Sequence, residues 1–231
     1  MPRYQYVLCD ADNTLLDFDA AEQTAIRRTL ERHGIPCPPE TAALYRAINA
    51  ALWARYDSGE GIVQEWLVTE RFATLLRALG RAGDPRALNL TYLEHLGSQA
   101  ILLPGAQALC RTLAQTCTLA IVTNGVAASQ RRRFDRCALR PYISHLFISG
   151  EMGCQKPKRA FFDRVCQAMG IADRRQAVIV GDKLASDIQG GLNADIDTIW
   201  YNPQGRPGDP SVPPTWVAAD FDAVRRIVLS G

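Results

Sequence analysis

The sequence has little histidine and no large excess of charge of either sign. Its 231 residues include 3 histidines, 26 lysines and arginines and 24 aspartates and glutamates, so the formal net charge is +2. A chain with so balanced a charge does not indicate the broad basic surface that attracts nucleic acid or an anionic membrane. We therefore expect neither a nucleic-acid polymer nor a membrane as a partner.

Long apolar runs and paired cysteines are also missing. No run approaches the roughly 20 apolar residues of a membrane-spanning helix, and the N-terminal MPRYQYVLCDAD does not have the pattern of a signal peptide. The seven cysteines include no C-x-x-C pair. An odd number without paired spacing favours reduced, mostly buried thiols over a disulfide framework or a zinc site. We expect a cytoplasmic protein that is a monomer or a weak dimer.

Short apolar runs that end in polar or glycine-containing turns predict buried strands. They lie at residues 6–10, 119–125, 146–150, 177–182 and 197–202. Helical patterns accompany the later strands, at residues 106–115, 127–137, 159–169 and 186–194. Strands that alternate with helices predict an α/β fold, a Rossmann-like parallel sheet covered on both faces.

Residues 18–98 contain no convincing strand. The segment is interpreted as four helices, at residues 20–33, 41–56, 63–79 and 85–96. We therefore predict an α/β core of residues 1–17 and 99–231 and an inserted all-helical cap of residues 18–98. The insertion follows the first strand, so the cap should lie over the carboxyl end of the sheet, where parallel sheets bind their ligands.

Four aspartates stand close together in the stretch VLCDADNTLLDFDA, residues 7–20. Asp10 closes the first strand and Asp12 follows two positions later, a spacing that tends to send both side chains to the same side. Two neighbouring carboxylates need a cation or a shared proton. Asp17 and Asp19 stand at the start of the next helix, where aspartate caps the helix and complements its dipole.

Other strand ends carry polar groups that should meet this pair. Thr123 and Asn124 end the second strand, Lys156 precedes a helix after the third, and Asp182 ends the fourth, with Asp187 five residues on. Carboxylates suit a hard divalent cation such as Mg²⁺, and lysine and hydroxyl groups suit the oxygens of a phosphate. No histidine or cysteine has zinc-like spacing.

The order Asp10-x-Asp12-x-Thr14, Thr123, Lys156 and Gly181-Asp182 with Asp187 resembles the four motifs of the haloacid dehalogenase superfamily. The insert resembles its helical cap. The resemblance implies a phosphohydrolase in which Asp10 is the nucleophile and forms an aspartyl-phosphate. It also implies that Asp12 protonates the leaving oxygen and then activates water. Dehalogenases of the superfamily usually lack this second acid, so phosphate transfer is favoured.

The same resemblance assigns the remaining polar residues. It implies that Thr123, Asn124 and Lys156 bind the phosphoryl oxygens. Mg²⁺ would be held by Asp10, Asp182 and the backbone carbonyl of Asp12. Asp187 would bind the metal through water or orient Lys156. A phospho-acceptor receiver domain uses similar residue types, but it is about half this length and has no helical insert.

A finer resemblance lies outside the motifs. The segments 10–19, 47–72, 103–109 and 181–195 together resemble the noncanonical pyrimidine nucleotidases. That resemblance implies a small phosphate monoester such as dUMP, UMP or dTMP as substrate. Phosphoglycolate and sugar-phosphate phosphatases share the cap class and stay as the alternative. Trp53, Tyr56 and Trp66 could stack on a base, although aromatic residues at helical spacing also form cores.

Two basic features are expected to face solvent. Lys183 follows Asp182 at a position where the family often has a small or neutral residue. Arginines occupy residues 131–133 within a predicted helix. Each could attract an anionic substrate, but a solvated surface is the simpler interpretation.

Overall fold

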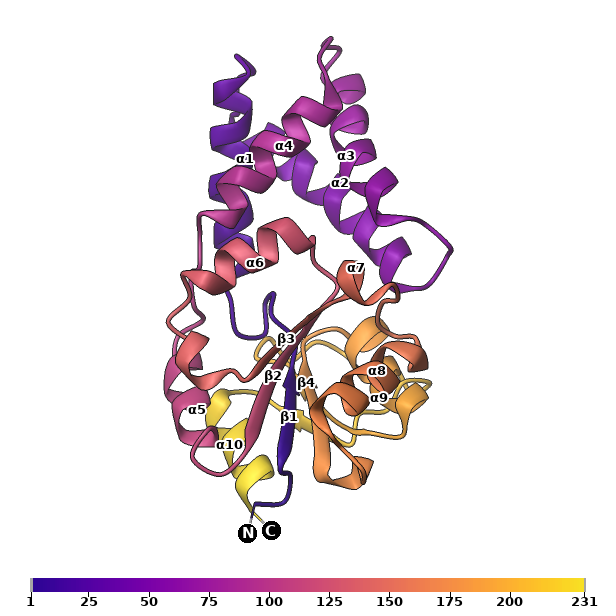
Figure 1. Ribbon diagram of the computed structural model, residues 1–231. Coiled ribbons are helices and arrows are strands. Elements are labelled where there is room, and N and C mark those ends of the chain that lie inside the picture. The colour runs from indigo at the N-terminus through magenta and orange to yellow at the C-terminus, as the bar shows by residue number, and fades with distance from the viewer. Residues whose placement is uncertain (1, 231) are drawn as a thin grey trace.

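Six parallel strands form the sheet of the computed structural model, which describes residues 2–230 (Figure 1). The strands are β1 (Tyr6–Cys9), β2 (Thr118–Thr123), β3 (His145–Ile148), β4 (Ala177–Gly181), β5 (Asp197–Tyr201) and β6 (Trp216–Ala218). Their order across the sheet is β3-β2-β1-β4-β5-β6, and every neighbouring pair is parallel. The first strand is therefore central, and β2 and β4 lie on either side of it.

Helices cover both faces of the sheet. They are α5 (Ala106–Leu113), α6 (Ala127–Asp135), α7 (Ser149–Met152), α8 (Arg159–Met169), α9 (Gln189–Ala194) and α10 (Phe221–Leu229). Short turns of helix lie at η1 (Arg140–Tyr142), η2 (Arg174–Gln176) and η3 (Leu184–Ile188). This arrangement confirms the predicted α/β fold.

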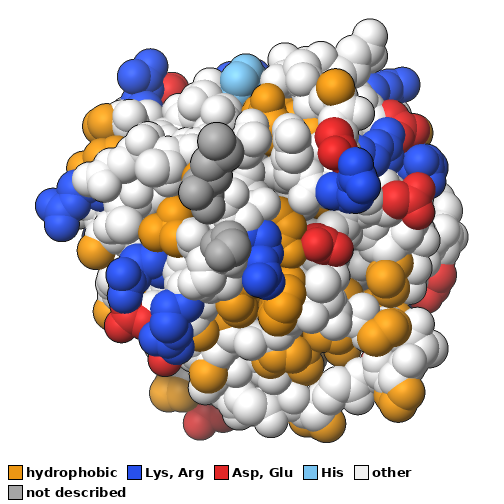
Figure 2. Space-filling model, turned by 90° about the horizontal axis from the view of Figure 1, so that it is seen from below, with side chains coloured by type: hydrophobic (Ala, Val, Ile, Leu, Met, Phe, Trp, Pro, Cys, Tyr) orange, Lys and Arg blue, Asp and Glu red, His pale blue; other side chains and the backbone are white. Residues whose placement is uncertain are grey.

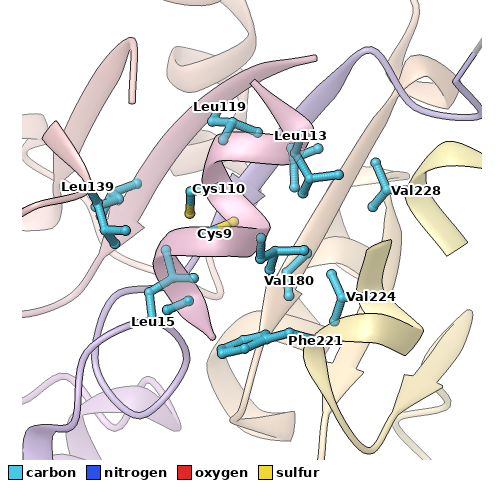
Figure 3. Close-up of a cluster of buried hydrophobic side chains, with 14 of the residues drawn as sticks. Cys9, Leu15, Cys110, Leu113, Leu119, Leu139, Val180, Phe221, Val224 and Val228 are labelled. Carbon is cyan, nitrogen blue, oxygen red and sulfur yellow. The ribbon is translucent and has the colours of Figure 1, made fainter. Parts of the chain in front are cut away.

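The central strands are apolar throughout because they are buried on both faces. Val7 and Cys9 of β1 belong to one hydrophobic cluster, and Leu8 between them belongs to a second one. The first cluster lies under α5 and α10, and Figure 3 shows Cys9 and Val180 of the sheet among their side chains. The second lies under α8, whose buried residues include Phe161.

Four further helices form a separate group above the sheet (Figure 1). They are α1 (Phe18–Arg32), α2 (Pro39–Asp57), α3 (Gln64–Ala78) and α4 (Pro85–Gly97). This group, here called the cap, has its own core, in which the Phe72 ring lies 5.3 Å from Tyr45 and 5.7 Å from Tyr92. The insertion of helices after β1 is thus as predicted, while the division at residues 17/18 and 98/99 stays a prediction.

The two chain segments that join the cap to the core run side by side. The backbone N–H of Asp17 donates to the carbonyl of Ile101 at 2.9 Å, and that of Leu103 donates to the carbonyl of Leu15 at 3.0 Å. Leu15 and Leu16 are buried in the core beside this crossing. The cap is therefore attached through one short, hydrogen-bonded pair of segments.

The structure adds two elements that the sequence pattern did not predict. Strand β6 has only three residues, too few to show a periodicity, and α10 lies beyond the last predicted element. Helix α10 packs its buried residues Val224 and Val228 against the first core cluster. Strand β6 forms one edge of the sheet, and α10 helps to cover the face that carries the first cluster.

The distribution of surface charge and the state of the cysteines are those that the composition predicts. Figure 2 shows the face on the side away from the cap, where basic and acidic side chains are interspersed. All seven cysteines are free thiols, five of them buried. Across residues 2–230, no helix has the length and apolar character needed to span a bilayer. The cytoplasmic location and the monomeric or weakly dimeric state stay predictions.

Replacing Phe72 by alanine should destabilise the protein by about 3–5 kcal/mol, because the ring is fully buried between Tyr45 and Tyr92. Urea unfolding measures the change in the free energy of unfolding. Trp66→Ala on the same helix is the matched control, because that side chain is 44% exposed and its removal should change stability by less than about 0.5 kcal/mol. Equal losses in both variants would contradict the assignment of the cap core.

Candidate active site

The polar residues at the strand ends meet at one cavity between the sheet and the cap. Asp10 follows β1, Thr123 ends β2 and Asp182 follows β4, as the parallel topology requires. Lys156 reaches the same place from the loop before α8, and Asp187 from η3. The cavity has a volume of about 580 Å³, within the range of about 300–1,000 Å³ typical of small-molecule sites.

Lys156 is the buried cation of the site, with 1% of its side chain exposed. Its ammonium group donates to Asp10 Oδ1 at 2.7 Å, to Asp187 Oδ1 at 2.6 Å and to the carbonyl of Val122 at 2.9 Å. Three acceptors satisfy all three N–H groups. Burial lowers the pKa of Lys156, but the carboxylates of Asp10 and Asp187 outweigh it and leave that pKa raised.

Carboxylates outnumber the lysine at this point. Burial raises the pKa of Asp10 to about 8, opposed by Lys156 and reinforced by Asp187, Asp182 and Asp12. Burial and Asp187 likewise raise the pKa of Asp182 to about 6. The protein alone therefore disfavours the fully ionised set, and a further positive charge would stabilise it.

The donor set fits a magnesium ion. Asp10, Asp182 and Asp187 each bring a carboxylate oxygen within 4.8 Å of the others. The Oδ1 atom of Asp182 is buried without a hydrogen-bond partner among the described residues, and hard oxygen ligands are those that Mg²⁺ prefers. A side chain at Gly181 would lie 2.3 Å from the Asp187 carboxyl group, so only glycine permits this approach.

Asp187 has both of its oxygens engaged. Oδ1 accepts from Lys156, and Oδ2 accepts from the backbone N–H of Lys183 at 3.1 Å. Its side chain is fully buried. Of the two roles left open for it, the orientation of Lys156 is the one for which the structure provides a contact.

Thr123 and Asn124 differ in what they can offer a ligand. The Thr123 hydroxyl accepts from the N–H of Gly125 at 3.0 Å and from Gln130 at 3.1 Å, which leaves its own proton free to donate. The Asn124 side chain is occupied instead, because it bonds the backbone N–H and carbonyl of Lys156, both at 3.0 Å. Asn124 therefore holds the lysine loop in place with its side chain.

Asp12 lies apart from the three-carboxylate group and is held by helix α6. Its Oδ1 accepts from Arg133 Nη1 at 2.5 Å, and its Oδ2 accepts from Gln130 at 2.7 Å. Arg133 is 1% exposed and also donates to the carbonyl of Gln99, where the chain leaves the cap. The interpretation of residues 131–133 as a solvated face is therefore wrong for Arg133.

The helical spacing of Gln130 and Arg133 indicates that both side chains lie on the same side of the helix. Gln130 and Arg133 are three residues apart and share one face of α6, whereas Arg131 and Arg132 are exposed. A run of three arginines conceals the difference, because only the third points into the protein. Asp17, in contrast, does what its position predicts and accepts from the N–H of Ala20 at 2.9 Å as the N-cap of α1.

Lys183 and Asp57 connect the core to the cap. The Lys183 ammonium donates to Asp57 Oδ2 at 2.8 Å, and Asn124 donates to the other oxygen of Asp57 at 2.9 Å. Asp57 is the last residue of α2 and is buried. Lys183 was expected to point to solvent; it is half exposed, yet its charge is paired with a cap residue next to the active site.

Only one of the three candidate aromatic residues of the cap lines the cavity. Trp53 does so, and its ring meets that of Tyr56 edge-on at 5.4 Å. Tyr56 is buried behind it in a small hydrophobic cluster. Trp66 is exposed and has no place on the cavity wall. The stacking surface predicted from these residues is thus reduced to Trp53.

The cap wall also carries polar residues that belong to no motif of the sequence. Glu22 and Asn49 are buried and line the cavity, and Asn49 Nδ2 donates to Glu22 Oε1 at 2.6 Å. Burial raises the pKa of Glu22 to about 7, although Asn49, Arg71 and Arg46 oppose the shift. Within an amphipathic helix, a glutamate facing inward cannot be told from a surface glutamate without the positions of its partners.

Comparisons with known proteins agree with this geometry. The model of the haloacid dehalogenase-like hydrolase family matches residues 4–195. The chain is 36% identical to the pyrimidine 5′-nucleotidase PynA of Streptococcus pneumoniae, covering 92% of this chain and 90% of that one. It is 31% identical to the pyrimidine 5′-nucleotidase YjjG of Escherichia coli, with 98% of each chain covered.

One solved structure is similar over almost its whole length. It is the HAD-hydrolase YfnB of Bacillus subtilis bound to magnesium, with a TM-score of 0.92, 34% identity and coverage of 98% of this chain and 99% of that one. The protein described here therefore belongs to the haloacid dehalogenase-like hydrolases.

Replacing Arg133 by methionine should lower kcat/KM at least tenfold, because Asp12 would lose the charged partner that fixes its carboxylate. Steady-state phosphate release measures the effect, and a thermal melt verifies that the variant is folded. Arg132→Met is the matched control, since the neighbouring side chain is exposed. Equal activity in the two variants would mean that Arg133 does not position Asp12.

Replacing Glu22 by glutamine should stabilise the protein at pH 8 and have little effect near pH 4. The pKa of Glu22 rises from 4.5 to about 7 on folding, so the folded state prefers the protonated form. The stability that this preference provides is complete below pH 4.5 and is lost as the pH rises through 7. Urea unfolding of the variant and the unmodified protein measures the effect of the substitution on the free energy of unfolding. This effect should be more stabilising at pH 8 than at pH 4 by roughly 3 kcal/mol. A pH-independent effect would contradict the raised pKa.

Proposed function

We propose that this protein is a magnesium-dependent phosphatase that hydrolyses nucleoside 5′-monophosphates with a pyrimidine base. One observation carries the phosphatase part: a buried aspartate, Asp10, is paired with a buried lysine, Lys156, and faces an open cavity. The pyrimidine 5′-nucleotidase relatives support the choice of substrate.

In this proposal Asp10 attacks phosphorus. Its Oδ1 is held by Lys156, whereas Oδ2 has only the Thr14 hydroxyl at 3.4 Å as a partner in the described part of the chain. In this proposal Oδ2 forms the bond to phosphorus as the bond to the leaving oxygen breaks, which gives an aspartyl-phosphate. The positive charge of Lys156 and the free proton of Thr123 would stabilise the charge on the phosphoryl oxygens.

Asp12 would transfer the protons of both half-reactions. It gives a proton to the leaving oxygen and later takes one from the water that attacks the aspartyl-phosphate. Arg133 and Gln130 each donate to one of its oxygens, so the carboxyl group is held in one orientation for both steps.

Asp10, Asp182 and the backbone carbonyl of Asp12 would hold the magnesium ion. Asp187 is the third carboxylate beside this site. When bound, the ion would neutralise these carboxylates and draw charge from the phosphoryl oxygens. The magnesium-bound structure of YfnB supports this choice of metal.

The size of the cavity favours a nucleotide over a small organic phosphate. Its volume of about 580 Å³ extends from Asp10 to the cap residues Glu22 and Arg71. A two-carbon phosphate such as phosphoglycolate would leave most of that space empty, whereas a base and a ribose would reach the cap wall. We therefore prefer the nucleotidase function to the phosphoglycolate or sugar-phosphate alternative.

Asp10→Asn should reduce the release of phosphate from dUMP to background, because an amide cannot form the acyl phosphate. Removal of Mg²⁺ with a chelator should abolish the activity of the unmodified protein, and added Mg²⁺ should restore it. Asp222→Asn, an exposed acid on α10, is the control and should retain full activity. Turnover by Asp10→Asn would refute the assigned nucleophile.

A further inference from the structure

A buried chain of polar side chains in the cap is not needed for any step at phosphorus. Asn49 joins Glu22 to Arg71, because it donates to Glu22 at 2.6 Å and accepts from Arg71 Nη1 at 3.1 Å. Arg71 Nη2 then donates to Asn89 at 2.8 Å, and its Nε donates to the carbonyl of Val68 at 3.2 Å. Side chains locked in this way present fixed hydrogen-bonding groups to a ligand.

Two of these side chains line the cavity, and each has one polar atom with bonding capacity to spare. Glu22 Oε2 has no hydrogen bond within residues 2–230, since its nearest cation, Arg46 Nε, lies 3.7 Å away. Asn49 Nδ2 uses one of its two N–H groups on Glu22, so the other is free. Arg46 also lines the cavity. The wall therefore offers one negatively charged acceptor with N–H donors beside it.

We propose that Glu22, Asn49 and Arg46 bind the imide edge of a uracil or thymine ring, in which one N–H stands between two carbonyl groups. This inference rests on the proposed nucleotidase function. The ring N–H would donate to Glu22 Oε2, and the carbonyls would accept from Asn49 and Arg46. Enzymes commonly recognise a base through hydrogen bonds to this edge.

The apolar residues nearby suit the faces of such a ring. Phe18, Trp53, Leu93 and Leu96 line the same cavity as the polar wall. A planar base packs well against aromatic and aliphatic side chains while its edge makes the polar contacts. A sugar phosphate has no flat apolar face to use these side chains.

The charge of Glu22 makes the site selective between pyrimidines. Uracil and thymine have an N–H at ring position 3, where cytosine has an unprotonated nitrogen that only accepts. A carboxylate opposite that nitrogen is an acceptor facing an acceptor, which leaves both groups without a partner. Glu22 has a pKa of about 7, so at pH 8 it is mainly the carboxylate. We therefore expect dUMP to be preferred over dCMP at pH 8.

The decisive variant is Glu22→Gln, assayed at pH 8. Its carbonyl oxygen can keep the bond from Asn49, so its NH₂ group would turn to the ring as a donor. The kcat/KM for dUMP should fall roughly ten- to hundredfold, while dCMP loses little, so that the ratio of dUMP to dCMP falls with it. Ribose 5-phosphate lacks the ring, so Glu22→Gln and the unmodified protein should hydrolyse it at the same rate.

Two further variants separate recognition from stability and charge. Glu31→Gln removes the same charge from the same helix, but Glu31 is exposed and pairs with Arg27, so the dUMP to dCMP ratio of this variant should not change. Arg46→Gln changes a side chain that is 50% exposed, so the fold should tolerate it. It should lower kcat/KM for dUMP severalfold and leave that for ribose 5-phosphate unchanged.

The outcomes distinguish this inference from the function on which it rests. If the unmodified protein hydrolyses ribose 5-phosphate but no nucleotide, the nucleotidase function fails. If it hydrolyses dUMP, but Glu22→Gln keeps its dUMP to dCMP ratio and Arg46→Gln keeps its kcat/KM for dUMP, the function stands and the imide site is refuted. The site is supported if the ratio falls in Glu22→Gln but not in Glu31→Gln, and if Arg46→Gln loses activity toward dUMP but not toward ribose 5-phosphate.

Discussion

The buried contact between Lys156 and Asp10 is the interaction on which the rest of the site depends. A lone ammonium group without solvent would be strongly destabilised, and so would a lone carboxylate. Together, with Asp187 as a second acceptor, they pair opposite charges through hydrogen bonds of 2.6–2.7 Å. Asn124 fixes the lysine backbone, and Gly181 leaves room for Asp187. Much of the surrounding sequence therefore serves to keep this ion cluster in place.

Two aspartates only two residues apart have opposite surroundings. Asp10 is buried among other carboxylates, and burial raises its pKa to about 8. Asp12 is 24% exposed and is paired with Arg133, which is not shared with the other acids. Environments that differ in this way separate the roles of otherwise identical groups. The sequence contains both residues, but the difference arises from β4, η3 and α6, which come much later in the chain.

How much the sequence could predict follows from the range of the interactions. Asp10, Thr123 and Asp182 were found because each ends a strand, and parallel topology brings strand ends together. The sequence does not reveal the inward positions of Arg133 and Glu22, because each lies on a helix whose inward face depends on a partner that is distant in sequence. Asp12 and Arg133 are 121 residues apart, and Glu22 and Asn49 are 27 apart. Strand β6 was too short to be noticed at all.

The cap is coupled to the chemistry by charge as well as by position. Asp57, at the end of a cap helix, accepts from Lys183 and Asn124, and these two residues adjoin Asp182 and Thr123 respectively in the sequence. A movement of the cap would break bonds made by the immediate neighbours of two active-site residues. Because Asp57 is buried, its separation from Lys183 would leave a charge without a partner unless water enters. The pair of Lys183 and Asp57 therefore favours the position that the cap has in the structure, because moving the cap away would require water to solvate both groups.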